Sequence, residues 1–159
     1  MKKIELLGEF DCKIDTKGRM RVPAQLLKQL GDGDGGTHTF VVNRGLEKNL
    51  MLYPKPVWDR IIAKVSSLNQ FDRNNRKFIR YMYRGAQIIE LDSSDRILIK
   101  KPLLEFAGIE KEIMLFAQGD QIEVWSKEEY LNDMLLEPNE DFIALAEKVM
   151  RGRMGDENE

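Results

Sequence analysis

The sequence has one cysteine, one histidine and no long apolar segment, and each scarcity narrows the possible functions. Cys12 alone cannot form an internal disulfide, which favours a reducing compartment. His38 has no partner at metal-ligand spacing, so we predict no metal site and no cofactor. No apolar run approaches the length that spans a membrane, and the first residues lack the apolar core of a signal peptide. We therefore expect a cytoplasmic protein with no membrane partner.

The formal net charge of −2 hides a segregation of charge along the chain. Five basic residues and one acid lie between Lys13 and Lys28, and five more basic residues with no acid lie between Arg73 and Arg84. Segment 137–159 carries seven acids against three bases. A phosphate backbone responds to a local basic face, so the negative total does not exclude nucleic acid as a partner.

The most informative feature is an internal repeat. Asp15-x-x-x-Arg19 recurs as Asp92-x-x-x-Arg96, and after the same interval a Leu-Leu pair follows in both places. Further on, three aligned blocks continue the match: 40–42 with 114–116, 50–54 with 122–126, and Trp58 with Tyr130. An ordered set of this kind indicates two copies of one structural unit.

Each copy is predicted to be mostly β. In the first copy a strand runs into a turn at Asp15–Gly18, and a second strand, Arg19–Val22, leads to a short helix that Pro23 opens and Gly31 ends. Strands at 39–43 and 50–53 and a helix at 56–68 complete it. The expected organisation is an α+β fold with a first unit at 1–68, a partly helical linker at 69–84, a second unit at 85–136, a helix at 137–150 and a disordered tail at 151–159.

Several short motifs, taken in order, resemble the MraZ family of bacterial regulators. They are Gly8-Glu9, Asp15-Thr-Lys-Gly-Arg19 followed by Val22-Pro23, Arg44-Gly45-Leu46, Leu52-Tyr53-Pro54, the segment 78–85, and Val124-Trp125-Ser126-Lys127. The resemblance covers roughly residues 1–150.

The resemblance implies two tandem AbrB/SpoVT-like swapped-hairpin units that form a pseudo-two-fold β-barrel with peripheral helices. It also implies a nucleoid-associated transcriptional repressor that acts on the division and cell wall gene cluster, including its own operon. Such a protein binds double-stranded DNA at direct repeats in the promoter, and it assembles as a ring-shaped homo-oligomer.

The predicted DNA contacts lie at and after the repeated turns. Arg19 and Arg21 alternate along a strand, so they share one face, and arginine forms paired hydrogen bonds with guanine. In the second copy Asp95 replaces Gly18 beside the arginine, and the proline is displaced to 102, which predicts a weaker contribution. The DNA-binding set is Lys17, Arg19 and Arg21, with the weaker counterparts Arg96, Lys100 and Lys101; the turn-structural set is Asp15, Gly18 and Asp92.

Other readings of these residues stay open. The arginine strand could be merely a solvated face, and the basic cluster at 73–84 could contact phosphate or form an intersubunit ion-pair strip. An AbrB-like antitoxin would bind both DNA and a toxin. An enzyme would need Asp15 and Asp92 as a carboxylate pair, but no nucleophile or cofactor motif accompanies them. We therefore predict no catalytic residue and no small-molecule substrate.

Overall fold

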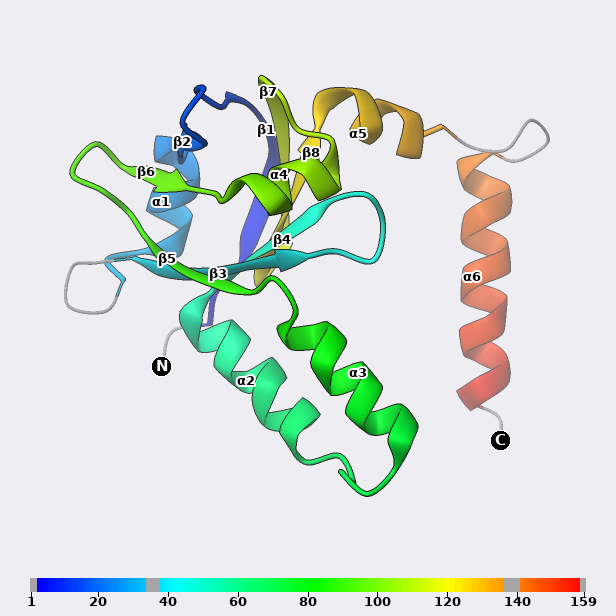
Figure 1. Cartoon of the computed structure of the whole chain (residues 1–159). Coiled ribbons are helices and arrows are strands. Elements are labelled where there is room, and N and C mark those ends of the chain that lie inside the picture. Colours follow the sequence, from blue (N-terminus) through cyan, green and yellow to red (C-terminus); the bar gives the residue numbers. More distant parts are fainter. Residues whose placement is uncertain (1–2, 34–37, 136–140, 158–159) are drawn as a thin grey trace. The chain divides into compact units, whose positions relative to one another are not determined.

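A computed structural model describes residues 3–33, 38–135 and 141–157, which group into two compact units, Met1–Glu129 and Tyr130–Glu159. Figure 1 shows the elements. The strands are β1 (Leu6–Lys13), β2 (Arg19–Arg21), β3 (Thr39–Arg44), β4 (Leu50–Pro54), β5 (Gln87–Glu90), β6 (Arg96–Leu98), β7 (Glu112–Gly119) and β8 (Gln121–Ser126). The helices are α1 (Ala24–Leu30), α2 (Lys55–Ser66), α3 (Arg73–Tyr83), α4 (Lys101–Ala107), α5 (Lys127–Asp133) and α6 (Phe142–Glu157).

The fold is α+β, and its main component is a six-stranded antiparallel sheet in the order β1-β7-β8-β4-β3-β5. Strands β2 and β6 form a separate two-stranded ribbon. The six-strand order has two free ends, so the described strands do not close into the barrel that the resemblance implies. Pairing exchanges partners between the copies: β1 pairs with β7, β5 with β3, β2 with β6 and β4 with β8.

The strand register corrects one detail of the sequence alignment. Phe40 lies opposite Pro54 in the β3–β4 hairpin, and Ile113 lies opposite Ser126 in the β7–β8 hairpin. Pro54 and Ser126 occupy the same place in the two copies, so Phe40 corresponds to Ile113 and not to Met114. A slip of one residue would move every side chain to the other face of the sheet, and the buried core enforces the observed register.

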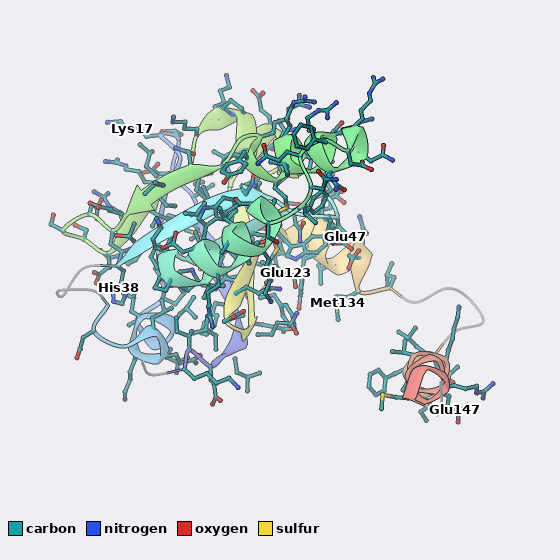
Figure 2. The ribbon with its side chains drawn as sticks, turned by 90° about the horizontal axis from the view of Figure 1, so that it is seen from below. Lys17, His38, Glu47, Glu123, Met134 and Glu147 are labelled. Atoms are coloured by element: carbon teal, nitrogen blue, oxygen red, sulfur yellow. The ribbon has the colours of Figure 1, made fainter. Side chains whose placement is uncertain are left out.

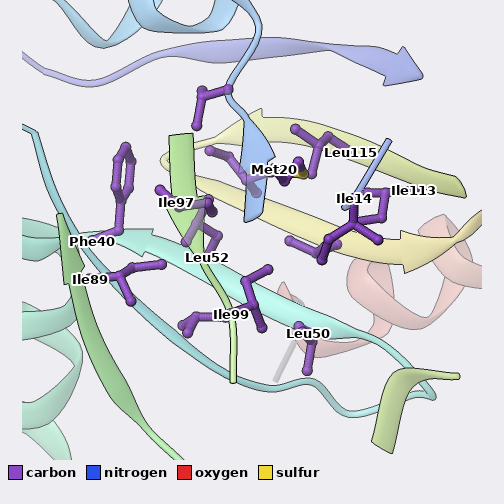
Figure 3. Close-up of a cluster of buried hydrophobic side chains, with 14 of the residues drawn as sticks. Ile14, Met20, Phe40, Leu50, Leu52, Ile89, Ile97, Ile99, Ile113 and Leu115 are labelled. Carbon is purple, nitrogen blue, oxygen red and sulfur yellow. The ribbon is translucent and has the colours of Figure 1, made fainter. Parts of the chain in front are cut away.

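One hydrophobic core lies between the sheet and the ribbon, and Figure 3 shows its central side chains. Met20 and Ile97, the middle residues of β2 and β6, point into it and are completely buried. Leu26 of α1 and Leu103 of α4 pack into the same cluster. Ribbon and sheet therefore hold each other in place, because neither could bury its apolar face alone.

Three helices begin at proline or aspartate residues that are recognisable in the sequence as helix starts. Pro23 and Pro54 directly precede α1 and α2, and Asp72 caps α3 by accepting a hydrogen bond from the backbone N–H of Asn75 at 3.1 Å. The linker was expected to be partly helical, and α3 occupies most of it.

The last helix, α6, differs from the sequence-based expectation. It is drawn as a helix as far as Glu157, beyond position 151, where the sequence places the start of the expected disordered tail. No proline interrupts this stretch, and its glycines lower helix propensity without breaking the helix. Residues 137–140 and 158–159, to which helix and tail were also assigned, lie outside the described residues.

Candidate nucleic-acid interface

The first repeated turn is organised by the Asp15 carboxylate. Its Oδ1 accepts hydrogen bonds from the backbone N–H groups of Lys17 and Arg19, both at 2.9 Å, and its Oδ2 accepts the Nε–H of Arg19 at 2.8 Å. The Asp15 N–H in turn donates to the Arg19 carbonyl at 2.9 Å. One side chain thus shapes the turn and also orients the guanidinium at the start of β2.

The second turn repeats this network residue by residue. Asp92 accepts from the backbone N–H groups of Ser94 at 2.8 Å and Arg96 at 2.9 Å, and from Arg96 Nε–H at 2.9 Å. Asp95 takes the place of Gly18 and adopts a left-handed φ of 59°. Aspartate tolerates this conformation better than most residues, so the glycine-to-aspartate change preserves the turn.

These contacts lower the pKa of both aspartates. For Asp15 the largest cause is the hydrogen bond from the backbone N–H of Arg19, with further lowering by the Arg19 side chain and the Lys17 N–H. For Asp92 the hydrogen bond from the backbone N–H of Arg96 is the largest cause of the lower pKa. Both carboxylates are therefore ionised and acceptor-only at neutral pH, which suits a structural role and gives them no proton to donate as a general acid.

Each turn is tied to the end of the opposite strand across the ribbon. The Ile99 N–H donates to the Gly18 carbonyl at 2.8 Å, and the Val22 N–H donates to the Asp95 carbonyl at 2.9 Å. Gly18 has φ +86° and is buried, and a Cβ at this position would lie 2.6 Å from the Ile99 carbonyl oxygen. The first turn therefore requires glycine both for its backbone angle and for the close approach of the other copy.

The ribbon register gathers the arginines of both copies on one surface. Arg19 is the Cα partner of Leu98, and Arg21 is the Cα partner of Arg96. Because side chains alternate along a strand, these four residues share the outward face. We call this set, Arg19, Arg21, Arg96 and Leu98, the outer ribbon face. The sequence correctly predicted that Arg19 and Arg21 share a face, but it gave no sign that Arg96 lies beside Arg21.

The remaining predicted contacts lie around this face. Lys17 is exposed in the first turn, and Figure 2 shows it at the periphery of the first unit. Lys100 and Lys101 are exposed at the start of α4, just after β6. Lys101 lies 3.9 Å from Glu105, a loose and solvated pair that leaves the ammonium group accessible.

The outer ribbon face combines a two-stranded ribbon with three arginines, and both features occur in proteins that bind nucleic acid. A two-stranded ribbon fits the major groove of B-DNA, where arginine forms paired hydrogen bonds with guanine O6 and N7. The guanidinium groups of Arg19 and Arg96 donate to Asp15 and Asp92 through Nε–H. A guanidinium has five N–H donors, so the terminal amino groups of Arg19 and Arg96 remain for an acceptor on DNA.

The second basic cluster lies elsewhere. Its residues are on α3 and directly after it, and Figure 1 shows α3 well away from β2 and β6 within the first unit. Arg76 donates through Nη1 to the Gln70 carbonyl at 2.9 Å, so part of the cluster serves the α2–α3 hairpin. This cluster and the outer ribbon face therefore do not form one continuous surface within a subunit.

Other chemistry-bearing residues do not gather around the ribbon. Burial, together with the charge of Asp11, raises the pKa of the Cys12 thiol to about 11, which makes it a poor nucleophile. Within the described ranges, no group of three or more His, Cys, Asp or Glu side chains could hold a metal ion. Nor does any helix in those ranges have the length and apolar character needed to cross a membrane.

A cavity of about 610 Å³ lies in the first unit between α3 and the β3–β4 hairpin. Glu47 and Glu123, which Figure 2 labels, are among its lining residues. Arg44 and Phe106 also line it, and the guanidinium carbon of Arg44 lies 4.9 Å from the centre of the Phe106 ring. The residues that line this cavity come from several elements far apart in the sequence, so no local sequence motif predicts the cavity. No residue of the outer ribbon face lines this cavity.

Comparison with known proteins adds a family match over most of the chain. The model of the family described as "MraZ protein, putative antitoxin-like" matches residues 6–81 and again residues 82–149. Two consecutive matches to one family model agree with the internal repeat.

Individual relatives agree with the family match. A protein named "Transcriptional regulator MraZ" from Christiangramia forsetii is 41% identical over 150 residues, covering 92% of this chain and 94% of its own. A protein of the same name from Cytophaga hutchinsonii is 40% identical over 143 residues, covering 90% of this chain and 93% of its own. A third, from Clostridium acetobutylicum, is 34% identical over 143 residues, covering 90% of this chain and 95% of its own.

Proposed function

This chain belongs to the MraZ family, whose relatives are named transcriptional regulators, and we propose that it regulates transcription by binding double-stranded DNA through the outer ribbon face. The observation that carries the proposal is the convergence of both Asp-x-x-x-Arg turns on one ribbon, where Arg21 and Arg96 are direct cross-strand partners. Two like charges placed opposite each other on a strand pair destabilise it, so an anionic partner is the natural reason for the arrangement.

In the proposed complex the ribbon enters the major groove. Arg19, Arg21 and Arg96 contact base edges, and Lys17 contacts the phosphate backbone beside the first turn. Lys100 and Lys101 reach the backbone from the start of α4. Asp15 and Asp92 keep the guanidinium groups of their arginines in place, so less side-chain entropy is lost on binding.

The fold we propose is a pair of tandem AbrB-like swapped-hairpin units, at 1–68 and 85–136, related by a pseudo-two-fold axis. Support comes from the exchange of strand partners between the copies, in which the first strand of each copy pairs with the third strand of the other. The ribbon lies at the centre of this exchange because β2 pairs with its own counterpart, β6.

The proposed biological setting follows the family resemblance. The chain assembles as a ring-shaped homo-oligomer in the cytoplasm, in association with the nucleoid. It represses the division and cell wall gene cluster, including its own operon, by binding direct repeats upstream. A ring would place several ribbons on one DNA segment, and the repeated contacts would raise affinity through effective concentration.

The test is a binding titration with a labelled duplex taken from upstream of the chain's own gene, against a scrambled duplex of the same composition. The intact protein should prefer the upstream duplex, and Arg21→Ala should weaken binding by about 5- to 150-fold, since a bidentate guanine contact is worth about 1–3 kcal/mol.

Arg60→Ala is the matched control. It removes the same charge from an exposed site on α2, away from the ribbon, and should leave affinity nearly unchanged. Equal binding of both duplexes by the intact protein, or equal losses for the two variants, would contradict the proposal.

A further inference from the structure

One member of the outer ribbon face is apolar. Leu98 is 51% exposed, although its neighbours Ile97 and Ile99 are buried in the core. The strand alternation leaves Leu98 no way to turn inward. In the repeat it corresponds to Arg21, so perfect symmetry would place a fourth arginine of the outer ribbon face here.

The surroundings of Leu98 show where on the ribbon leucine stands in place of arginine. It is the cross-strand partner of Arg19, and its Cδ1 lies 3.6 Å from the point that a Cβ on Gly18 would occupy. Its exposed methyl groups thus lie beside the first turn. One end of the ribbon presents Arg21 with Arg96, whereas the other presents Arg19 with Leu98.

We infer that Leu98 is a specificity-determining residue that contacts the 5-methyl group of a thymine in the major groove. The inference rests on the proposed function and deepens it. In the major groove thymine alone among the four bases presents a methyl group, and apolar side chains recognise it. An exposed leucine among arginines on a groove-facing ribbon provides an apolar contact for that methyl group.

A second consequence concerns the polarity of the complex. Because the two ends of the ribbon differ, the ribbon reads a sequence that is not its own inverted repeat. Each subunit therefore has one preferred direction along the DNA.

The experiment uses the full chain and a duplex recovered by selection from a randomised pool. Each thymine of that duplex is replaced singly by deoxyuridine, which lacks only the 5-methyl group. At one thymine in each bound site, the intact protein should bind the deoxyuridine duplex about four-fold more weakly, the factor expected for one buried methyl-sized group. Leu98→Ala should bind the two duplexes equally.

Two further variants sharpen the result. Leu46→Ala is the matched control, because Leu46 is fully exposed in the β3–β4 turn, and it should keep the full thymine dependence. Leu98→Arg restores the symmetrical face and should replace the thymine preference with a guanine preference at the same base pair. Circular dichroism melting of Leu98→Ala checks that the fold is retained.

The possible outcomes distinguish a failure of the Leu98–thymine contact from a failure of DNA binding itself. If the intact protein selects no sequence from the pool, the proposed DNA binding fails. If it selects a sequence but no deoxyuridine replacement weakens binding, or Leu98→Ala keeps the thymine dependence, the role of Leu98 is overturned. A change in oligomeric mass for Leu98→Ala, with the thymine dependence intact, would assign Leu98 to a contact between copies instead.

Discussion

The first turn should be intolerant of any side chain at Gly18, and Gly18→Ala measures this. The Gly18 φ of +86° disfavours all L-residues with a Cβ, and that Cβ would meet the Ile99 carbonyl oxygen at 2.6 Å. The neighbouring backbone cannot yield freely, because the Ile99 N–H donates to the Gly18 carbonyl at 2.8 Å. The substitution therefore strains the contact that joins the two copies.

The size of the effect follows from these two costs. A left-handed backbone costs an alanine about 1–2 kcal/mol. The overlap with a backbone oxygen adds about 1–3 kcal/mol, as for other overpacked sites. We expect Gly18→Ala to lower the free energy of unfolding by about 3 kcal/mol in total. Because Lys17 and Arg19 flank the turn, DNA affinity should fall as well.

The assay is urea unfolding followed by circular dichroism at matched protein concentrations, since oligomerisation changes apparent stability. Gly119→Ala is the control: Gly119 has φ +61°, but a Cβ there would meet nothing within 4 Å. It carries the backbone cost alone, about 1 kcal/mol. If the two variants lose equal stability, the close approach of the copies at Gly18 is not what holds the ribbon.

Four further predictions concern charge and assembly. Binding should weaken steeply with salt, with a log–log slope of about −0.9 for each phosphate neutralised, and a titration from low to high salt measures it. Asp15→Asn should cost stability at neutral pH, and the difference from the intact protein should shrink as pH falls below 3.8, because the lowered pKa makes the Asp15 contribution present above that value and lost on acidification. Asp95→Gly, which removes an acid beside the ribbon, should tighten DNA binding at low salt, whereas Arg96→Ala should cost less affinity than Arg19→Ala. Light scattering at micromolar concentration should give the mass of an oligomer, and a monomer mass would contradict the proposed assembly.

Local features of this chain could be predicted from its sequence. The Asp15 turn, the glycine that follows and the helix after Pro23 depend on residues a few positions apart, so their chemistry is visible in the sequence itself. The repeat extended the same reasoning to Asp92 without further information.

Long-range features could not be predicted in the same way. The pairing of β2 with β6 joins segments from different copies, and nothing in either segment shows that Arg96 will face Arg21. The one-residue slip in aligning Phe40 has the same origin. Composition alone left open which neighbouring apolar residue faces the core, and only pairing with β4 and β5 decides it.

The most direct test of the central claim is photo-crosslinking of the full-length protein to a bromodeoxyuridine-labelled upstream duplex, with the crosslinked peptides identified by mass spectrometry. Crosslinks should fall in Lys17–Arg21 and Arg96–Leu98, on the two strands of the ribbon. Crosslinks confined to α3, with none in either ribbon segment, would contradict the assignment of the outer ribbon face as the DNA-binding surface.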